Sequence, residues 1–98
     1  MPIDERRRDK IAGAVAAYNA ADRKPLLAPG ATHLLTVMFA EADVCRRSMS
    51  RLVAETGGRT RIVARLLRIL IDAGFLSKDL ERPGVVSTYR LHLPPRRP

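Results

Sequence analysis

The 98-residue chain contains no tryptophan, and its only other aromatic side chains are two tyrosines and two phenylalanines. Proteins that bind single-stranded nucleic acid by base stacking depend on aromatic platforms, so this mode of binding is not expected here. A single cysteine, Cys45, excludes a disulfide framework within the chain and a cysteine-based zinc site. It fits a reducing compartment.

Long apolar runs are also missing. No stretch approaches the roughly 20 residues that a membrane span requires, and the charged start, Met1 to Lys10, is not followed by the apolar segment of a secretory signal. The length fits one domain, and a hydrophobic content of 46% is sufficient for a core. We therefore expect a cytoplasmic protein that does not contact membranes.

Patterns typical of enzymes and metal sites are missing as well. His33 and His92 are far apart and have no companion ligands, and no Ser-His-Asp order, carboxylate pair or phosphate-binding glycine loop is present. Cys45 is expected to be an inert buried thiol rather than a redox sensor. The sequence predicts a protein that is not an enzyme and that uses neither a metal ion nor a cofactor.

Positive charge is abundant and concentrated in one segment. Eighteen Lys and Arg residues against ten Asp and Glu give a net charge of +8. The segment Val44–Arg68 holds seven arginines and one acid, Glu55, hence +6, and the remaining 73 residues carry only +2. A GC-rich genome would raise the arginine content uniformly along the chain. A localised basic surface is instead typical of a protein that binds duplex DNA.

Hydrophobic periodicity predicts four helices and a β-hairpin. The helices are expected over residues 3–22, 31–42, 48–56 and 60–73, with Ser48 as the N-cap of the third. A brief strand is expected through Val44 and Cys45, and two longer strands over 75–80 and 85–93, around a turn at 81–84. We divide the chain into an N-terminal helix and connector (1–30), a main domain (31–93) and a loose basic tail (94–98).

The fourth predicted helix is strongly amphipathic. At 100° per residue, its apolar side chains fall within an arc of roughly 160°. This arc contains Ile62, Val63, Leu66, Leu67, Ile69, Leu70 and Ala73, and the opposite arc contains Thr60, Arg61, Ala64, Arg65, Arg68 and Asp72. Three arginines and a small alanine on one face suit an approach to the major groove of DNA, which is wide enough for a helix.

Residues 48–76, SMSRLVAETGGRTRIVARLLRILIDAGFL, resemble the helix-turn-helix core of the winged helix-turn-helix family. The matching positions are Leu52, Thr56, Gly57, Val63, Leu67, Leu70, Gly74, Phe75 and Leu76. The hairpin that ends in STYRLHLPP, residues 87–95, resembles the wing and its return strand. The sequence departs from the family pattern at Gly58 and Arg59, where an apolar residue and a serine are usual, so Thr60 is expected to cap the fourth helix.

The resemblance implies a mainly α fold with a small β-hairpin, a winged helix-turn-helix preceded by an extra N-terminal helix. It also implies sequence-specific binding of double-stranded DNA, with residues 60–73 as the recognition helix and Arg82 of the wing near the minor groove. Arg46, Arg47 and Arg51 would lie near phosphates. The full set of expected contact residues is Arg46, Arg47, Ser48, Arg51, Arg59, Thr60, Arg61, Ala64, Arg65, Arg68 and Arg82.

Transcriptional regulation at the nucleoid is the function we expect first. Three alternatives remain open: a replication, excision or partition factor of a plasmid, phage or integrative element; a winged helix used as a protein-interaction module; and an RNA-binding protein, which the lack of stacking aromatics disfavours. A homodimer is expected, because small winged proteins commonly bind two half-sites and because the Ile11, Val15 and Tyr18 face of the first helix needs a cover.

Overall fold

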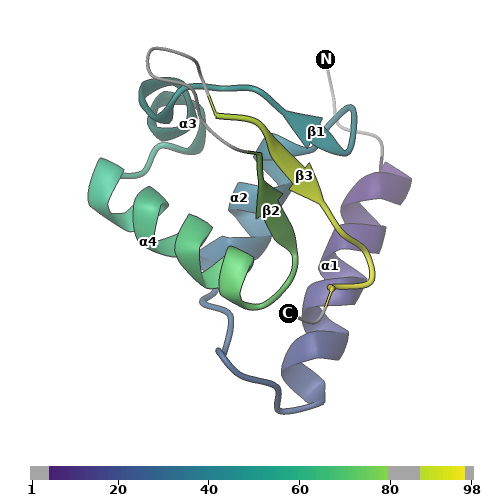
Figure 1. The fold of residues 1–98 in the computed structure, drawn as a ribbon. Coiled ribbons are helices and arrows are strands. Elements are labelled where there is room, and N and C mark those ends of the chain that lie inside the picture. The colour runs from purple at the N-terminus through teal and green to yellow at the C-terminus, as the bar shows by residue number, and fades with distance from the viewer. Residues whose placement is uncertain (1–4, 80–86, 97–98) are drawn as a thin grey trace.

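The computed structural model describes residues 5–79 and 87–96, which form four helices and one three-stranded antiparallel sheet (Figure 1). The helices are α1 (Glu5–Ala20), α2 (Gly30–Met38), α3 (Met49–Thr56) and α4 (Thr60–Asp72). The strands are β1 (Val44–Cys45), β2 (Leu76–Lys78) and β3 (Tyr89–Leu91). The predicted mainly helical chain with a small antiparallel β element is therefore confirmed, and the brief strand at Val44 and Cys45 is present.

Several helix ends follow from local sequence. The Ser48 hydroxyl accepts a hydrogen bond from the Arg51 amide at 3.2 Å, which confirms the predicted N-cap of α3. Gly57 ends α3 in the left-handed region at φ 70°, and Gly74 follows α4 at φ 87°. Glycine adopts these angles without the steric cost that a β-carbon imposes.

The start of α4 differs from the prediction. Arg59, not Thr60, occupies the N-cap position, with extended backbone angles and no capping hydrogen bond from its side chain. Thr60 is the first helical residue. Because the turn from Gly57 already sets the chain direction, the helix begins here without a side-chain cap. The Arg59 side chain is exposed at the N-terminal end of α4.

Helix α2 ends four residues earlier than the sequence predicted. Its last carbonyl groups are satisfied from outside the helix: the Arg47 guanidinium donates to the Val37 carbonyl at 2.6 Å, and the Arg7 Nε donates to the Phe39 carbonyl at 3.1 Å. The chain then turns so that Val44 and Cys45 pair with β3. Tertiary pairing thus overrides the helical propensity of residues 40–42.

The sheet has the strand order β1-β3-β2, with β3 in the centre. Cys45 lies opposite Tyr89 on one side of β3, and Leu76 lies opposite Leu91 on the other. Both β2 and β3 are shorter than the predicted strands 75–80 and 85–93. The predicted turn at 81–84, with Arg82, lies outside the described residues.

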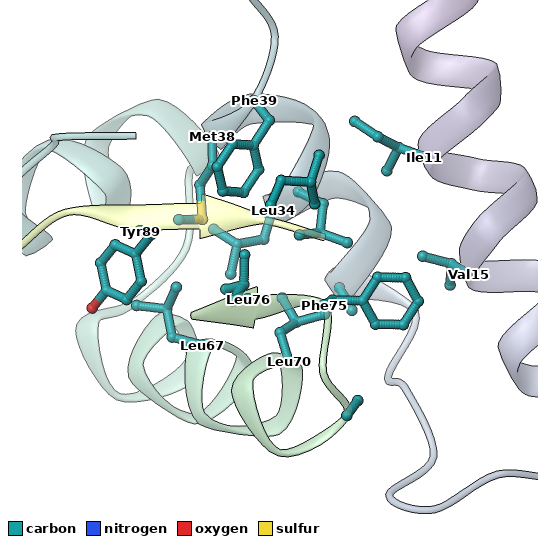
Figure 2. Packing of buried hydrophobic residues seen from close by; sticks show 14 of the residues in the cluster. Ile11, Val15, Leu34, Met38, Phe39, Leu67, Leu70, Phe75, Leu76 and Tyr89 are labelled. Atoms are coloured by element: carbon teal, nitrogen blue, oxygen red, sulfur yellow. The ribbon is translucent and has the colours of Figure 1, made fainter. Parts of the chain in front are cut away.

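One hydrophobic core joins α1 to the rest of the molecule. Ile11 and Val15 point from α1 toward Leu34 and Phe75 (Figure 2), and the rings of Tyr18 and Phe75 meet edge to face at 5.5 Å. The α1 face that was expected to need a second copy as its cover is therefore buried within the same chain. Within the described ranges, no helix is long and apolar enough to cross a membrane.

Residues 94–96, which were expected to be part of a loose tail, lie against Gly74. The Arg96 amide donates to the Gly74 carbonyl at 2.8 Å. A β-carbon at Gly74 would collide with the Arg96 carbonyl oxygen. The close approach of two backbones is therefore a second reason for glycine at this position, besides its positive φ.

Candidate nucleic-acid interface

Three arginines project into solvent from one side of α4. Arg61, Arg65 and Arg68 are exposed, and so is Ala64 between them. None of the three forms an ion pair within residues 5–79 and 87–96. Their guanidinium groups can therefore donate hydrogen bonds to a bound molecule without first breaking an ion pair.

The opposite side of α4 packs into the core. Val63, Leu67 and Leu70 are buried there, as the helical spacing predicted. Ile62 was expected on this apolar face, but it is 53% exposed. It lies at the edge of the arc, about 80° from Leu70 on an ideal helix, where it borders an open hollow of about 470 Å³ beside Leu26.

Arg51 of α3 and Arg47, which precedes α3, are held by the same acid. Glu55 forms an ion pair with Arg51 at 2.8 Å and another with Arg47 at 3.2 Å. The Arg47 side chain is 27% exposed and also donates to the Val37 carbonyl. Arg47 therefore links α2 to α3 and is not placed as the exposed phosphate contact that was expected. Arg51, whose side chain is 70% exposed, can still contact a ligand but carries a paired charge.

The remaining expected contact residues of the described chain lie on its surface. Arg46 follows β1, and Arg59 and Thr60 stand at the start of α4; all three are exposed. Ser48 is also exposed, although its hydroxyl accepts the capping hydrogen bond of α3. Arg82 belongs to the residues that the structure does not describe.

A hollow of about 680 Å³ lies beside the arginine face of α4. It is bordered by Arg65 and Arg68 of α4 and by Lys78 and Tyr89 of the sheet. The Lys78 ammonium lies 5.9 Å from the centre of the Tyr89 ring. Lys78 was not among the expected contact residues, although period two places it on the same face of its strand as Leu76. Asp72 borders the same hollow and makes it less uniformly basic.

The cysteine and the histidines lie away from this surface. Cys45 is buried in the core, as expected, and burial raises the pKa of its thiol. His33 is exposed on α2, with its Nε2 3.3 Å from the Thr56 carbonyl oxygen. His92 is half-buried, with its Nε2 2.8 Å from the Ser77 hydroxyl. In the parts of the chain that the structure describes, no three His, Cys, Asp or Glu side chains cluster as metal ligands would.

No protein-family model matches the chain, and neither a curated protein nor a solved structure matches it. The function is therefore argued from the geometry and charge of its own residues.

Proposed function

We propose that this chain is a winged helix protein that binds double-stranded DNA and regulates transcription from the cytoplasmic nucleoid. Its element order supports this proposal: the helix pair α3 and α4 is followed by the antiparallel strands β2 and β3, the order that the resemblance to the winged helix-turn-helix family implies. In this proposal, α4 lies in the major groove and the segment between β2 and β3, with Arg82, lies over the flanking DNA.

The observation that carries the proposal is a set of three arginines on α4 that form no ion pair with any described residue. Arg61, Arg65 and Arg68 share one exposed face, and the single acid of the basic segment, Glu55, pairs with α3 arginines instead. Arginine donates two parallel hydrogen bonds to guanine in the major groove. A solvated face with no ligand could carry the same residues, but a protein gains little stability from three like charges on one helix face.

The contact residues divide into two groups by their position. Arg61, Arg65 and Arg68 lie on the groove-facing side of α4 and are proposed to contact base edges. Arg46 and Arg59 stand at the margins and are proposed to contact phosphates, which contributes affinity without sequence information. Lys78 is also proposed to contact a DNA phosphate, because it borders the same hollow as Arg68.

Duplex binding with single-residue variants tests the proposal. A preferred sequence is first selected from a pool of randomised duplexes, and its affinity and that of a random duplex are then measured over a range of salt concentrations. Arg61→Ala, Arg65→Ala or Arg68→Ala should cost about 1–3 kcal/mol on the preferred duplex and relax selectivity at one base pair. Arg46→Ala should weaken both duplexes alike and lower the salt slope by about one unit.

Arg8→Ala is the matched control, because Arg8 is an exposed arginine of α1, outside the proposed interface. If the α4 variants bind like the Arg8 variant, the DNA-binding proposal is wrong. Negligible DNA affinity of the parent, together with binding to an acidic protein, would favour a protein-interaction module. Equal losses on both duplexes would indicate DNA binding without sequence recognition, as in an architectural protein.

We further propose that the protein binds DNA as a homodimer, because two-fold-related half-sites are the usual target of small helix-turn-helix proteins. The apolar face of α1 gives no support for a homodimer, since the chain's own core covers it. Sedimentation of the protein alone and on its preferred duplex decides the matter. One copy per duplex at micromolar protein concentration would contradict the dimer.

A further inference from the structure

The chain that follows β3 passes beside α1 (Figure 1). A pocket of about 320 Å³ is lined by residues of these two segments and by Asp43. Three segments that are distant in sequence line it: the first half of α1, the residue before β1, and residues 91–96. None of its lining residues belongs to α3 or α4. At about 30 Å³ per water molecule, it has room for roughly ten waters, which places it at the small end of ligand pockets.

The charges around this pocket are not balanced. Arg7, Lys10 and Arg96 face a single carboxylate, Asp43, so the lining carries three positive charges and one negative, or +2 with His92 neutral. Asp43 is already paired with Arg7 at 2.7 Å. Within the described residues, neither Lys10 nor Arg96 has an ion-pair partner.

The walls of the pocket are held in place before any ligand arrives. The Arg7 guanidinium is fixed by the Phe39 carbonyl as well as by Asp43. The backbone of Arg96 is fixed by the Gly74 carbonyl, and the His92 amide donates to the Phe75 carbonyl at 2.9 Å. A preformed site loses less conformational entropy when it binds a ligand than a site that must order itself.

Apolar side chains complete the lining. Ile11 and Leu91 are buried in the core and border the pocket, together with the half-buried Leu93. An inorganic ion would fill only a small part of the space and would leave these surfaces without contact. A carbon skeleton that carries the negative charge fits both the size of the pocket and its mixed lining.

We propose that this pocket binds a small organic anion, whose carboxylate or phosphate group contacts Lys10 and Arg96. This site is separate from the proposed DNA interface, and the inference does not depend on DNA binding.

His92 supplies a second readout for such a ligand. Its surroundings are Arg7 and Lys10 of α1, Asp43 before β1, Arg90 of β3, the Ser77 hydroxyl of β2, and Arg96. Burial lowers the pKa of His92, and the charges of Arg96 and Arg90 lower it further. A bound anion offsets these charges and raises the pKa of His92 toward its usual value, so an anion whose own charge stays constant should bind more tightly as the pH falls through the pKa of His92.

Citrate and inorganic phosphate are the probes for the experiment. Each is titrated into isotope-labelled protein at constant ionic strength, and amide NMR shifts locate the binding site. Citrate should give saturable shifts at the amides of Lys10, Leu91, His92, Leu93 and Arg96, and phosphate should bind there more weakly because it leaves the apolar lining uncovered. Sorbitol, a neutral molecule of similar size, should give no saturable shifts.

Two variants and a matched control assign the binding to the pocket cations. Lys10→Gln and Arg96→Gln should each weaken citrate binding about tenfold, because each removes a charge-assisted hydrogen bond. Arg8→Gln removes one exposed positive charge from the same helix as Lys10, outside the pocket. Its citrate affinity should equal that of the parent.

Four results would overturn the proposal. The first is the absence of saturable shifts with citrate, and the second is citrate shifts that map to α4 rather than to the pocket. Equal weakening by Arg8→Gln would indicate attraction by net charge alone. If Lys10→Gln and Arg96→Gln lower the salt slope of duplex binding, the pocket cations are DNA contacts. Because citrate binding is measured without DNA, failure of this proposal is distinguishable from failure of the DNA-binding proposal.

Discussion

Helices α3 and α4 both carry arginines, and the two sets differ in what surrounds them. On α3 and the turn before it, Arg47 and Arg51 share the carboxylate of Glu55. On α4, Arg61, Arg65 and Arg68 form no ion pair in the described parts of the chain, although Asp72 borders the same hollow as Arg65 and Arg68. The difference separates arginines that hold the fold together from arginines that are available to a ligand, although both belong to one basic segment.

Arg47→Met should produce the largest difference in stability between the two sets. The variant removes the donor to the Val37 carbonyl and one partner of Glu55, so the free energy of unfolding should fall by about 1.5–3 kcal/mol. The α4 control Arg61→Met should change it by no more than about 0.5 kcal/mol, because that side chain is exposed and unpaired. Urea unfolding midpoints at unchanged slope measure both values. Equal losses of unfolding free energy in the two variants would show that Arg47 contributes no more to the stability of the fold than the exposed Arg61.

Glu55→Gln should make the α3 arginines resemble those of α4. The net charge of Val44–Arg68 rises from +6 to +7, because the single acid of that segment is removed. Arg51 then becomes available to phosphate, so duplex binding should strengthen on all sequences and the salt slope should rise by about one unit. Stability should fall by about 1–2 kcal/mol, since the Arg51 pair is largely exposed but the Arg47 pair is partly buried.

Glu41→Gln is the control for this change, because Glu41 is an exposed acid outside the basic segment. An equal rise in salt slope in this variant would show that total charge, rather than release of Arg51, is responsible. Weaker duplex binding by Glu55→Gln would show that Glu55 positions Arg51 for its contact instead of neutralising it.

The smallest expected effect on stability concerns His92, which lines the cationic pocket beside α1. Burial and the neighbouring Arg96 and Arg90 lower the pKa of His92 in the folded protein. The unfolded chain therefore takes up a proton first, so this contribution to stability is complete above about pH 6.5 and is lost as the pH falls toward the folded-state value. Urea midpoints measured from pH 8 to pH 5 should fall more steeply in the parent than in His92→Gln. Parallel curves would contradict the prediction.

Local sequence rules account for much of the fold. Helical periodicity located all four helices, and Ser48 begins α3 as predicted. Gly57 and Gly74, two positions of the family pattern, follow α3 and α4 at positive φ. These features depend on residues within about one helical turn of each other, so they can be inferred without knowledge of the rest of the molecule. The same rule would have found the Arg51–Glu55 pair, because the two residues are four positions apart on one helix.

Only part of the candidate site could be predicted from the sequence, because local rules do not describe contacts between different elements. The exposed face of α4 follows from its 3.6-residue period, so Arg61, Arg65 and Arg68 were identified correctly as exposed neighbours. The structural role of Arg47 depends on Val37 and Glu55, which belong to two different helices. The position of Lys78 beside α4 depends on how the sheet packs, and no pattern in the strand sequence specifies that packing.

The sequence by itself determined where the four helices lie, the Ser48 cap of α3 and the direction of the α4 arginines, because these are properties of one segment. Only the tertiary structure decided that Arg47 also pairs with Glu55, where α2 ended, and what covered α1. It also placed Arg96 against Gly74 and thereby formed a pocket from segments more than 80 residues apart. Such contacts depend on the packing of whole elements around a shared core, and short-range periodicity carries no information about that packing.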